Sequence, residues 1–247
     1  MNHVLVSIVT VCLNSEKTIR DTLESVLSQT YDNIEYIIVD GVSKDSTLQI
    51  VSSYKEKFEN RNISCQVISE KDNGLYDAMN KGIKCSHGEI IGIINSDDWY
   101  EKDAIETVVR EYEAKRFDYA YGHTRAHRLD GKDYVKYSRQ RKYITSRDWS
   151  HPSTFVTKAV YNKFLYDQGH FYEDFNLLLR VIKGKCKITI IDAVLANFRF
   201  GGVSNQKSIK KMIMRFKDRY SVYRDNGFSR LYILECLYME LGKFLFV

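Results

Sequence analysis

The chain has little of the material from which linkers, disulfide frameworks and membrane spans are made. Its 247 residues include one proline, Pro152, and 13 glycines, which argues against long disordered linkers. The five cysteines are scattered without a Cys-x-x-Cys pair, so we expect reduced thiols in a cytoplasmic protein, with neither disulfides nor a zinc site. No apolar run approaches the ~20 residues needed to cross a bilayer. The first residues lead straight into a strand-like run, so we expect no signal peptide.

Positive charge is concentrated near the carboxyl end. Hydrophobic residues make up 44% and charged residues 28% of the sequence, which is typical of a soluble globular protein with one large domain. The net charge is +5, but residues 207–230 alone contain eight Lys or Arg and two Asp or Glu. Setting these aside leaves 29 basic and 30 acidic residues, so the remainder is nearly neutral. The basic character therefore belongs to this one segment.

The first half of the chain alternates apolar runs with amphipathic stretches. Strands are predicted at residues 5–11, 34–39, 65–68, 90–94 and 117–121, and helices at 16–29, 46–58, 75–83 and 102–112. Strands that alternate with helices form a parallel sheet with right-handed crossovers. We therefore predict an α/β fold in which a nucleotide-binding sheet is flanked by helices.

After Gly122 this alternation gives way to a mixed pattern. Asp130-Gly131 lies between the strand-like runs 123–128 and 134–139 and predicts a hairpin or extended loop. A strand at 153–156, a helix at 175–182 and a strand at 188–191 are predicted to follow. We expect this half to cover an edge of the sheet and to shape a cleft, with a boundary near residue 122.

Two adjacent carboxylates follow one of the predicted strands. Asn95-Ser96-Asp97-Asp98 comes directly after the apolar run 90–94. Ligands of open α/β sheets bind at the carboxyl ends of the strands, and carboxylate oxygens there suit Mg²⁺ or Mn²⁺ beside a phosphorylated substrate. The pair is equally compatible with a cap on the next helix.

Acidic residues also follow two other predicted strands. Asp40 follows residues 34–39, and Asp72-Asn73-Gly74 follows residues 65–68. A carboxylate at a strand terminus can accept hydrogen bonds from a ribose or a base, whereas Gly74 can simply supply a positive φ in a turn. Their recurrence after three strands favours a ligand site over turns alone.

The motifs around these acids resemble those of family 2 glycosyltransferases. The resemblance is carried by Ser7-Ile8-Val9-Thr10-Val11-Cys12-Leu13-Asn14, Val39-Asp40-Gly41-Val42-Ser43-Lys44-Asp45-Ser46-Thr47, Asn95-Ser96-Asp97-Asp98, His151-Pro152-Ser153-Thr154-Phe155 and Gly201-Gly202-Val203-Ser204. The run from Ser69 to Gly82 is similar to that of a bacterial subgroup that builds surface polysaccharides. Each motif alone is weak, but together, in the family's order over residues 5–204, they are specific.

The resemblance implies a GT-A fold and inverting transfer of a sugar from a nucleotide-sugar. It assigns donor binding to residues in and near the strand-end loops: Thr10, Val11, Asn14, Asp40, Asp72, Gly74, Asn80, Ser96 and Asp97. Asp98 would be the ligand of Mn²⁺ or Mg²⁺, and the candidates for a wall of the donor or acceptor site are Trp99, His151 and Arg180. Ser96 stands where the first acid of the family's DxD motif is expected, which argues against tight metal binding without nucleotide.

Glu173-Asp174 is the predicted source of a catalytic base. An acceptor hydroxyl must lose its proton as it attacks, which calls for a base on the face of the sugar opposite the leaving group. The family's pattern is an acid before an aromatic residue, then an apolar stretch ending in Arg180, so Asp174 is the predicted base and Glu173 the fallback. Both acids would also favour a helix N-terminus by some tenths of a kcal/mol. For Arg180, a structural salt bridge is favoured over a contact with phosphate.

The carboxyl-terminal segment predicts two amphipathic helices. Apolar residues recur at helical spacing from Ile209 to Tyr223, with basic residues around them: Lys210, Lys211, Arg215, Lys217 and Arg219. This pattern fits a helix docked on the domain, and it equally fits adhesion to an anionic membrane leaflet at ~1 kcal/mol per well-placed Lys or Arg. A second apolar stripe over 231–247 predicts a surface or partner helix, which could serve a homodimer.

We therefore predict a GT-A domain at residues 1–206, with a nucleotide-binding half at 1–122 and an acceptor half at 123–206, followed by amphipathic helices at 207–247. The predicted activity is metal-dependent inverting transfer, by default from a UDP-sugar, to a hydroxyl of a polyprenyl-diphosphate-linked glycan in surface polysaccharide synthesis. The predicted location is cytoplasmic or peripheral on the inner face of the plasma membrane.

Three other functions compete with this prediction. A catalytically silent subunit that binds a sugar nucleotide or acts as a scaffold is the main alternative, because the first acid of the DxD motif is missing. A sugar-phosphate nucleotidyltransferase is disfavoured, since no glycine-rich phosphate loop follows the first strand. Nucleic-acid binding is disfavoured because an acidic site repels phosphate.

Overall fold

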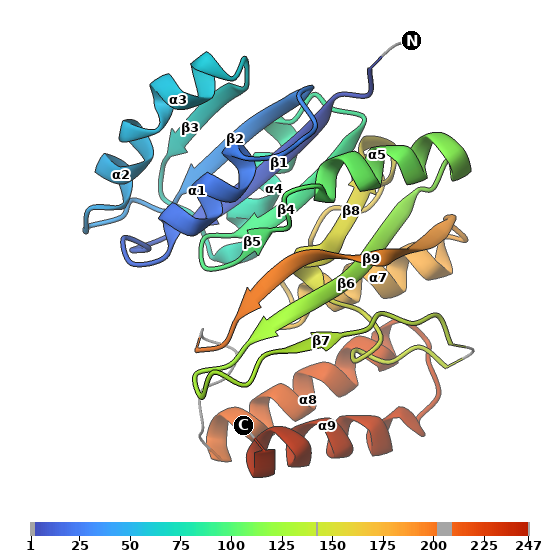
Figure 1. Cartoon of the computed structure of the whole chain (residues 1–247). Coiled ribbons are helices and arrows are strands. Elements are labelled where there is room, and N and C mark those ends of the chain that lie inside the picture. Colours follow the sequence, from blue (N-terminus) through green and yellow to red (C-terminus); the bar gives the residue numbers. More distant parts are fainter. Residues whose placement is uncertain (1–2, 142, 202–208, 247) are drawn as a thin grey trace.

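A mixed sheet runs through the molecule and carries helices on both faces (Figure 1). The computed structural model describes residues 3–141, 143–201 and 209–246. Within these residues the strands are β1 (Val6–Cys12), β2 (Ile34–Asp40), β3 (Ser64–Ser69), β4 (Ile90–Asn95), β5 (Trp99–Tyr100), β6 (Tyr119–His127), β7 (Tyr134–Lys136), β8 (Thr154–Thr157) and β9 (Ile188–Arg199). Their order across the sheet is β3-β2-β1-β4-β8-β6-β9-β5, and β7 pairs with β6.

The helices follow the predicted order, except that one predicted helix is divided and the short helix α6 was not predicted. They are α1 (Ile19–Leu27), α2 (Thr47–Ser53), α3 (Lys55–Asn60), α4 (Leu75–Cys85), α5 (Ala104–Lys115), α6 (Lys158–Tyr161), α7 (Glu173–Lys183), α8 (Ile209–Asp225) and α9 (Tyr232–Phe246), with a 3₁₀ turn η1 (His151–Ser153). The helix predicted over 46–58 is wrong as one element, because it is divided between α2 and α3 at Tyr54. There the Ser53 hydroxyl donates to the Ile50 carbonyl at 2.6 Å, a local bond that competes with regular helix geometry.

The predicted parallel sheet is confirmed for the first half of the chain. The strands β3, β2, β1 and β4 pair in parallel, and their side chains alternate between two apolar layers. Ile8 and Tyr36 face the layer covered by α1, α2, α3 and α5, whereas Val9 and Val39 face the layer covered by α4 and α7. On α4, a Cβ at Gly82 would come within 2.3 Å of the Val9 side chain, so a glycine is needed for this close approach of helix and sheet.

The second half adds antiparallel strands to the same sheet. Here β8 runs antiparallel to both β4 and β6, and the predicted hairpin around Gly131 is the antiparallel β6–β7 pair. The runs predicted separately at 117–121 and 123–128 form the one strand β6, which passes Gly122 with an irregularity in its pairing to β9. Strand β9 extends well past the predicted residue 191, because its pairing with β6 resumes after the irregularity and continues to Arg199. Asp192, within the irregular stretch, pairs with His123 at 2.9 Å.

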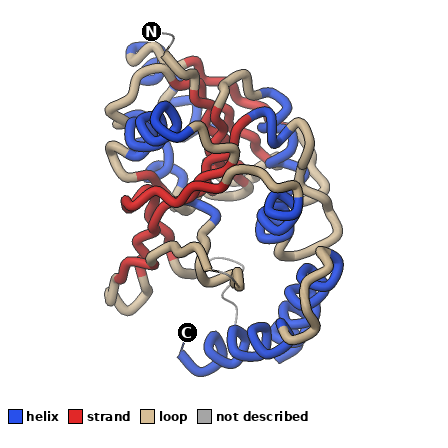
Figure 2. Tube along the Cα trace, turned by 90° about the vertical axis from the view of Figure 1, so that its right-hand side faces the viewer, coloured by secondary structure: helices blue, strands red, loops and turns tan. Residues whose placement is uncertain are grey.

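Helices α8 and α9 lie together at the end of the molecule opposite the N-terminus (Figures 1 and 2). Two of the five basic residues that the sequence places around the apolar stripe do not lie on a solvated face. Arg215 and Arg219 are 6% and 2% exposed, and both bind the buried carboxylate of Glu240 on α9, at 3.0 and 3.3 Å. Among the described residues, no helix has the length and apolar content required to cross a membrane.

Replacing Glu240 with alanine is expected to destabilise this helix pair strongly. The substitution leaves two arginines buried without their carboxylate, and breaking a buried ion pair from one side costs about 3–5 kcal/mol. Urea unfolding should show this loss of free energy of unfolding. Glu59→Ala removes an exposed pair with Lys55 on α3 and should cost less than about 1 kcal/mol. Equal losses of unfolding free energy in the two variants would contradict the role of Glu240 as the buried partner of Arg215 and Arg219.

Candidate active site

The carboxyl ends of the four parallel strands meet at one edge of the sheet. The register places Cys12 beside Asp40 and Asp40 beside Ser69, while Val11 lies beside Asn95. The loops that leave these strands therefore lie next to one another, and they contain most of the acids that the sequence singled out. This edge is where open α/β sheets bind their ligands.

Asp40 and Asp72 lie close together at this edge. Asp40 is fully buried, and its carboxylate accepts hydrogen bonds from the Ser43 backbone and hydroxyl and from the Ser69 hydroxyl at 2.7 Å. The Asp72 carboxylate lies over Gly41, where an added Cβ would be 2.6 Å from Asp72 Oδ2. Its other oxygen accepts from the Gly74 backbone, and Gly74 has the positive φ of +116° expected of a turn glycine.

Of the donor-site candidates near the end of β1, Asn14 lies in the loop, whereas Thr10 and Val11 lie within the strand. Asn14 joins two strand-end loops, because its backbone donates to Ser43 Oγ and its side chain accepts from the Lys44 backbone, both at 2.8 Å. Val11 and Thr10 are buried, and the Thr10 hydroxyl accepts from the Tyr36 hydroxyl within the core.

Asn80 does not lie open to a ligand. Its amide nitrogen donates to the Tyr166 carbonyl at 2.8 Å, and its amide oxygen accepts from the Tyr166 backbone nitrogen at 3.1 Å. Both ends of the side chain are therefore engaged in holding α4 against the loop at Tyr166.

Asp98 is a buried carboxylate with one unsatisfied oxygen. It is 1% exposed, and its Oδ1 accepts from the Arg199 backbone at 3.0 Å, whereas its buried Oδ2 has no partner among the described residues. Burial, followed by the neighbouring charge of Asp97, raises the pKa of Asp98 well above its ordinary value. Burial also raises the pKa of Asp97. A cation would relieve both penalties, so these residues fit a divalent ion.

A metal site at Asp98 would not be assembled from protein carboxylates alone. Within the described part of the chain, no group of three or more His, Cys, Asp or Glu side chains is arranged to hold an ion. Ser96, at the first position of the motif, instead shares a hydrogen bond of 2.7 Å with the Ser15 hydroxyl. That bond connects the end of β4 to the loop that carries Asn14.

Arg199 is the residue of this site that the sequence analysis missed. Its guanidinium pairs with Asp21, donates to the Asp97 carbonyl at 3.3 Å and lies 5.0 Å from the ring of Trp99. The other neighbour of Trp99 is His127, stacked at 4.8 Å. Arg199 lies two residues before Gly201 of the final family motif, which is the signal that could have drawn attention to it. Residues 202–204 of that motif lie outside the described residues.

Asp174 and His151 form a second polar group, next to Tyr76 in the first turn of α4. Asp174 is partly exposed at the N-terminus of α7, and its Oδ1 accepts from the Phe175 backbone at 2.8 Å and from the Tyr76 hydroxyl at 3.4 Å. Both ring nitrogens of His151 are buried without a partner among the described residues. Burial lowers the pKa of His151, and the nearby charge of Asp174 partly opposes that shift.

Glu173 and Arg180 are engaged in holding the loop before α7. Glu173 is fully buried, where it accepts from the Asp167 backbone and the Asn176 side chain, both at 2.9 Å, and burial raises its pKa. Arg180 pairs with Asp167 at 2.8 Å, so it forms a salt bridge within the loop before α7. The geometry therefore separates the two adjacent acids, because Asp174 is partly open and Glu173 is not.

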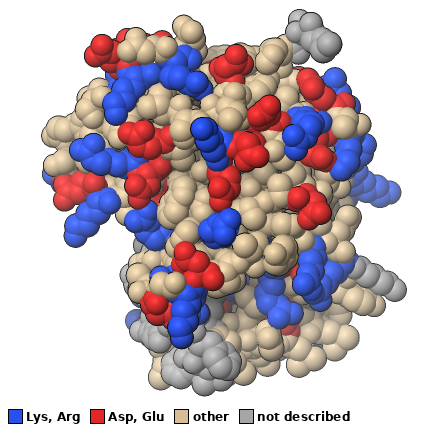
Figure 3. Space-filling model, in the orientation of Figure 1, with Lys and Arg blue, Asp and Glu red and all other residues tan. Residues whose placement is uncertain are grey.

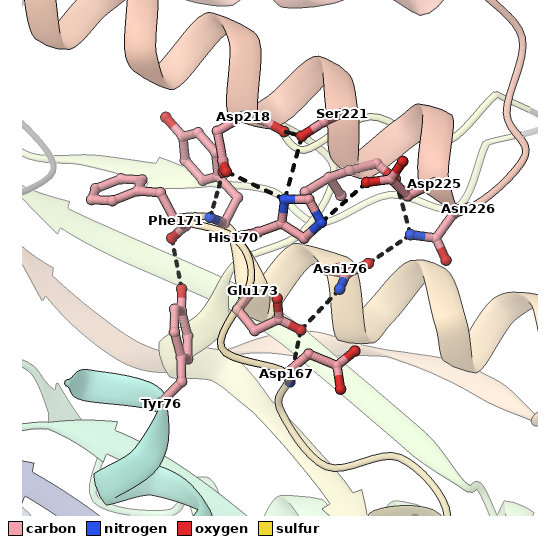
Figure 4. Close-up of polar contacts among 12 residues, drawn as sticks. Tyr76, Asp167, His170, Phe171, Glu173, Asn176, Asp218, Ser221, Asp225 and Asn226 are labelled. Atoms are coloured by element: carbon pink, nitrogen blue, oxygen red, sulfur yellow. Dashed lines mark hydrogen bonds and ion pairs between the residues drawn. The ribbon is translucent and has the colours of Figure 1, made fainter. Parts of the chain in front are cut away.

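Helix α8 also holds this loop, as Figure 4 shows. His170 lies between Asp218 and Asp225 of α8, at 3.3 Å from each. The Asn226 amide donates to Asn176 at 2.6 Å, and Asn176 in turn donates to Glu173. A chain of hydrogen bonds thus runs from the end of α8 to the residue beside Asp174.

The sheet, its flanking helices and the acids at its edge define a GT-A fold, and the comparisons agree. The family described as glycosyl transferase family 2 matches residues 7–181. The protein belongs to this family. Among relatives, EpsH of Bacillus subtilis is 43% identical over 105 residues, which are 42% of this chain and 29% of EpsH.

A second relative is an Escherichia coli protein, the UDP-Glc:alpha-D-GlcNAc-diphosphoundecaprenol beta-1,3-glucosyltransferase WfaP. It is 34% identical over 120 residues, which cover 47% of this chain and 45% of WfaP. The chain thus spans less than half the length of either relative.

Two solved structures share the fold. TarS of S. aureus in complex with UDP-GlcNAc has a TM-score of 0.69 at 18% identity, covering 97% of this chain and 72% of the TarS chain. The mannosyltransferase PcManGT of Pyrobaculum calidifontis, in complex with GDP-Man and Mn²⁺, also has a TM-score of 0.69, at 14% identity, covering 100% of this chain and 71% of that chain.

Asp98→Asn is expected to stabilise the ligand-free protein at neutral pH. The raised pKa of Asp98 means that its ionised form destabilises the fold above that pKa, and this penalty disappears as the pH falls through it. The substitution should raise the free energy of unfolding by about 1 kcal/mol at neutral pH, with a smaller gain in acid. Thermal unfolding at several pH values measures this difference in stability. Asp103→Asn, at an exposed aspartate, is the control. A loss of stability in Asp98→Asn would contradict a destabilising effect of the buried Asp98 carboxylate.

Proposed function

We propose that the protein is an inverting glycosyltransferase that moves a sugar from a nucleotide-sugar, a UDP-sugar by preference, to a hydroxyl of a lipid-linked glycan. The observation that carries the proposal is the buried Asp98 carboxylate with its unsatisfied oxygen, placed beside Asp97 at the end of β4. A buried unpaired polar atom costs about 1–3 kcal/mol, and a bound cation would offset that cost at Asp98.

The donor nucleotide would lie over the strand-end loops. Asp72 lies over Gly41, the residue that follows Asp40, and both acids are candidates for contacts with the ribose and the base. Asn14 and Ser96 belong to the two loops that the Ser15–Ser96 hydrogen bond connects. Asp97 would face the ribose or the donor sugar. Support for a UDP donor comes from the UDP-Glc named for WfaP and the UDP-GlcNAc bound to TarS.

A divalent cation, Mn²⁺ or Mg²⁺, would be held by Asp98. When bound, such an ion supplies positive charge that stabilises the diphosphate leaving group. The Mn²⁺ present with PcManGT supports this choice of ion. The neighbouring Arg199, held in place by Asp21, would lie close to the diphosphate.

Asp174 would act as the base. The acceptor oxygen attacks the anomeric carbon as the bond from that carbon to the diphosphate oxygen breaks, and the hydroxyl proton passes to Asp174. Its Oδ1 is oriented by the Phe175 backbone and the Tyr76 hydroxyl, which leaves Oδ2 without a partner among the described residues. Trp99 and His151 remain candidates for the walls of the donor and acceptor sites.

The acceptor is proposed to be a polyprenyl-diphosphate-linked glycan. The WfaP name includes diphosphoundecaprenol, which supports this class. The chemistry requires only that the acceptor present one hydroxyl to Asp174, so the identity of the glycan and its linkage do not enter the mechanism above.

The proposal is tested first by thermal unfolding with UDP, GDP and dTDP, each with and without Mn²⁺. A ligand that binds the native state at about 100 times its Kd adds about 2.7 kcal/mol of stability. We expect a manganese-dependent rise in Tm with UDP that is lost in Asp98→Asn. No rise with any nucleotide would favour the catalytically silent scaffolding subunit and remove Asp98 as a metal ligand.

Asp174→Asn is expected to abolish transfer while leaving donor binding intact, because the amide cannot accept the acceptor proton. Loss of general base catalysis typically costs a factor of about 10²–10⁴ in rate. Glu173→Gln is the matched control, since it keeps the oxygen that accepts from Asp167 and Asn176 and should retain most of the turnover. The measurement is release of nucleoside diphosphate with a lipid-linked acceptor. Near-normal turnover in Asp174→Asn would reject it as the base.

A further inference from the structure

The described part of the α8–α9 region carries a cluster of exposed apolar side chains. Large apolar residues that are more than a third exposed occur here at Ile209, Ile213, Met214, Leu231, Ile233, Leu234, Leu237, Tyr238 and Leu241, with Leu231 at 73% and Leu234 at 64%. They are more than half of all such residues that the structure describes. Apolar surface gathered in this way marks an interaction site.

Charge of one sign surrounds this cluster. Lys210 and Lys217 are exposed on α8, and Arg230 is exposed in the connection between α8 and α9. The exposed Arg147 lies 4.7 Å from the ring of Tyr238 on α9. Among the atoms at the lower end of the molecule that Figure 3 does not draw in grey, most belong to uncharged side chains. The surface is therefore apolar with a basic margin.

The acids of these helices are directed elsewhere. Glu240 is buried against Arg215 and Arg219, Glu235 bonds to Ser146, and Asp218 binds His170. The remaining acid, Asp225, also pairs with His170, on the side facing the loop before α7. Three of the four acids are thus buried or half-buried in contacts with the rest of the protein, and the fourth, Asp225, is directed at His170, so the exposed charges beside the apolar cluster are mainly positive.

We propose that the outer face of α8 and α9, defined by the nine apolar residues above with Lys210, Lys217, Arg230 and Arg147, is a docking surface for an anionic lipid bilayer. A helix pair with apolar and basic side chains on one face lies in the interface between headgroups and acyl chains, where each Lys or Arg near anionic lipid adds to the attraction. The proposal deepens the proposed function, on which it rests for the lipid-linked acceptor, by placing the protein on the membrane that holds that acceptor.

The charge distribution favours a bilayer over a second copy of this chain. A two-fold interface brings the same patch of each copy together, so the basic margins of two copies would face one another without acids to pair with. Anionic headgroups instead supply the complementary charge. The binding should therefore depend on the lipid charge and weaken with salt.

Flotation with vesicles tests the proposal without any sugar donor. The full chain is mixed with vesicles of phosphatidylcholine alone or with phosphatidylglycerol added. We expect binding to the vesicles that contain phosphatidylglycerol, weakened about fivefold by Lys210→Gln or by Lys217→Gln. The double substitution Leu234→Asp and Leu237→Asp should reduce binding at least about tenfold, because it removes two inserted apolar side chains.

Leu129→Asp is the matched control, since Leu129 is 86% exposed on the β6–β7 hairpin and should leave vesicle binding unchanged. Leu231→Asp, before the start of α9, is the second variant if the double substitution unfolds the helix, as judged by circular dichroism. Unchanged flotation of well-folded variants would overturn the proposal. So would a parent protein that does not float but forms a dimer that Leu234→Asp and Leu237→Asp dissociate.

These results are independent of catalysis. A protein that shows the manganese-dependent nucleotide effect but no flotation would retain the proposed function and lose the docking surface. A protein that floats but shows no nucleotide effect would retain the surface and lose the proposed transfer.

Discussion

The parallel pairing of β1, β2, β3 and β4 is the constraint on which the rest of the structure depends. Parallel register brings Cys12, Asp40, Ser69 and Asn95 to one edge, so that four loops leave the sheet side by side. Asp40 ends β2 and Asp98 follows β4, and both carboxylates are almost completely buried there. Burial of a carboxylate is costly. The pairing of the strands thus holds acids at this edge against that cost, and Asp98, whose pKa is raised by burial and by Asp97, shows it most clearly.

The sequence predicted this part of the fold well because the signals are local. Runs such as Ile90–Asn95 are apolar on both faces, and the helices between strands have one apolar face. The extent of β9 could not be predicted in the same way, since Asp192 interrupts the apolar pattern and its partner His123 is distant in the sequence. Similarly, the role of Arg199 depends on a β9 backbone that reaches Asp98 from 101 residues away.

The sequence indicated which residues belong to the candidate site, but not how far each side chain is buried or which partners it binds. Glu173 and Asp174 are neighbours in sequence and both carry a carboxylate. Only the fold shows that Glu173 is buried and bound by Asn176 and the Asp167 backbone, whereas Asp174 is partly exposed. Asn80 presents the opposite case, because a residue inside a family-like motif is engaged by the backbone of Tyr166. Burial and partner choice depend on contacts between distant segments, which a single sequence does not display.

Helix α8 shows how one element can serve two surfaces. Its inner side carries Arg215 and Arg219, which bind Glu240, and Asp218, which binds His170 in the loop before α7. With these groups turned inward, the large side chains exposed on α8 are mainly apolar or basic. The contacts that attach α8 to the domain are therefore also what gives its outer face this character.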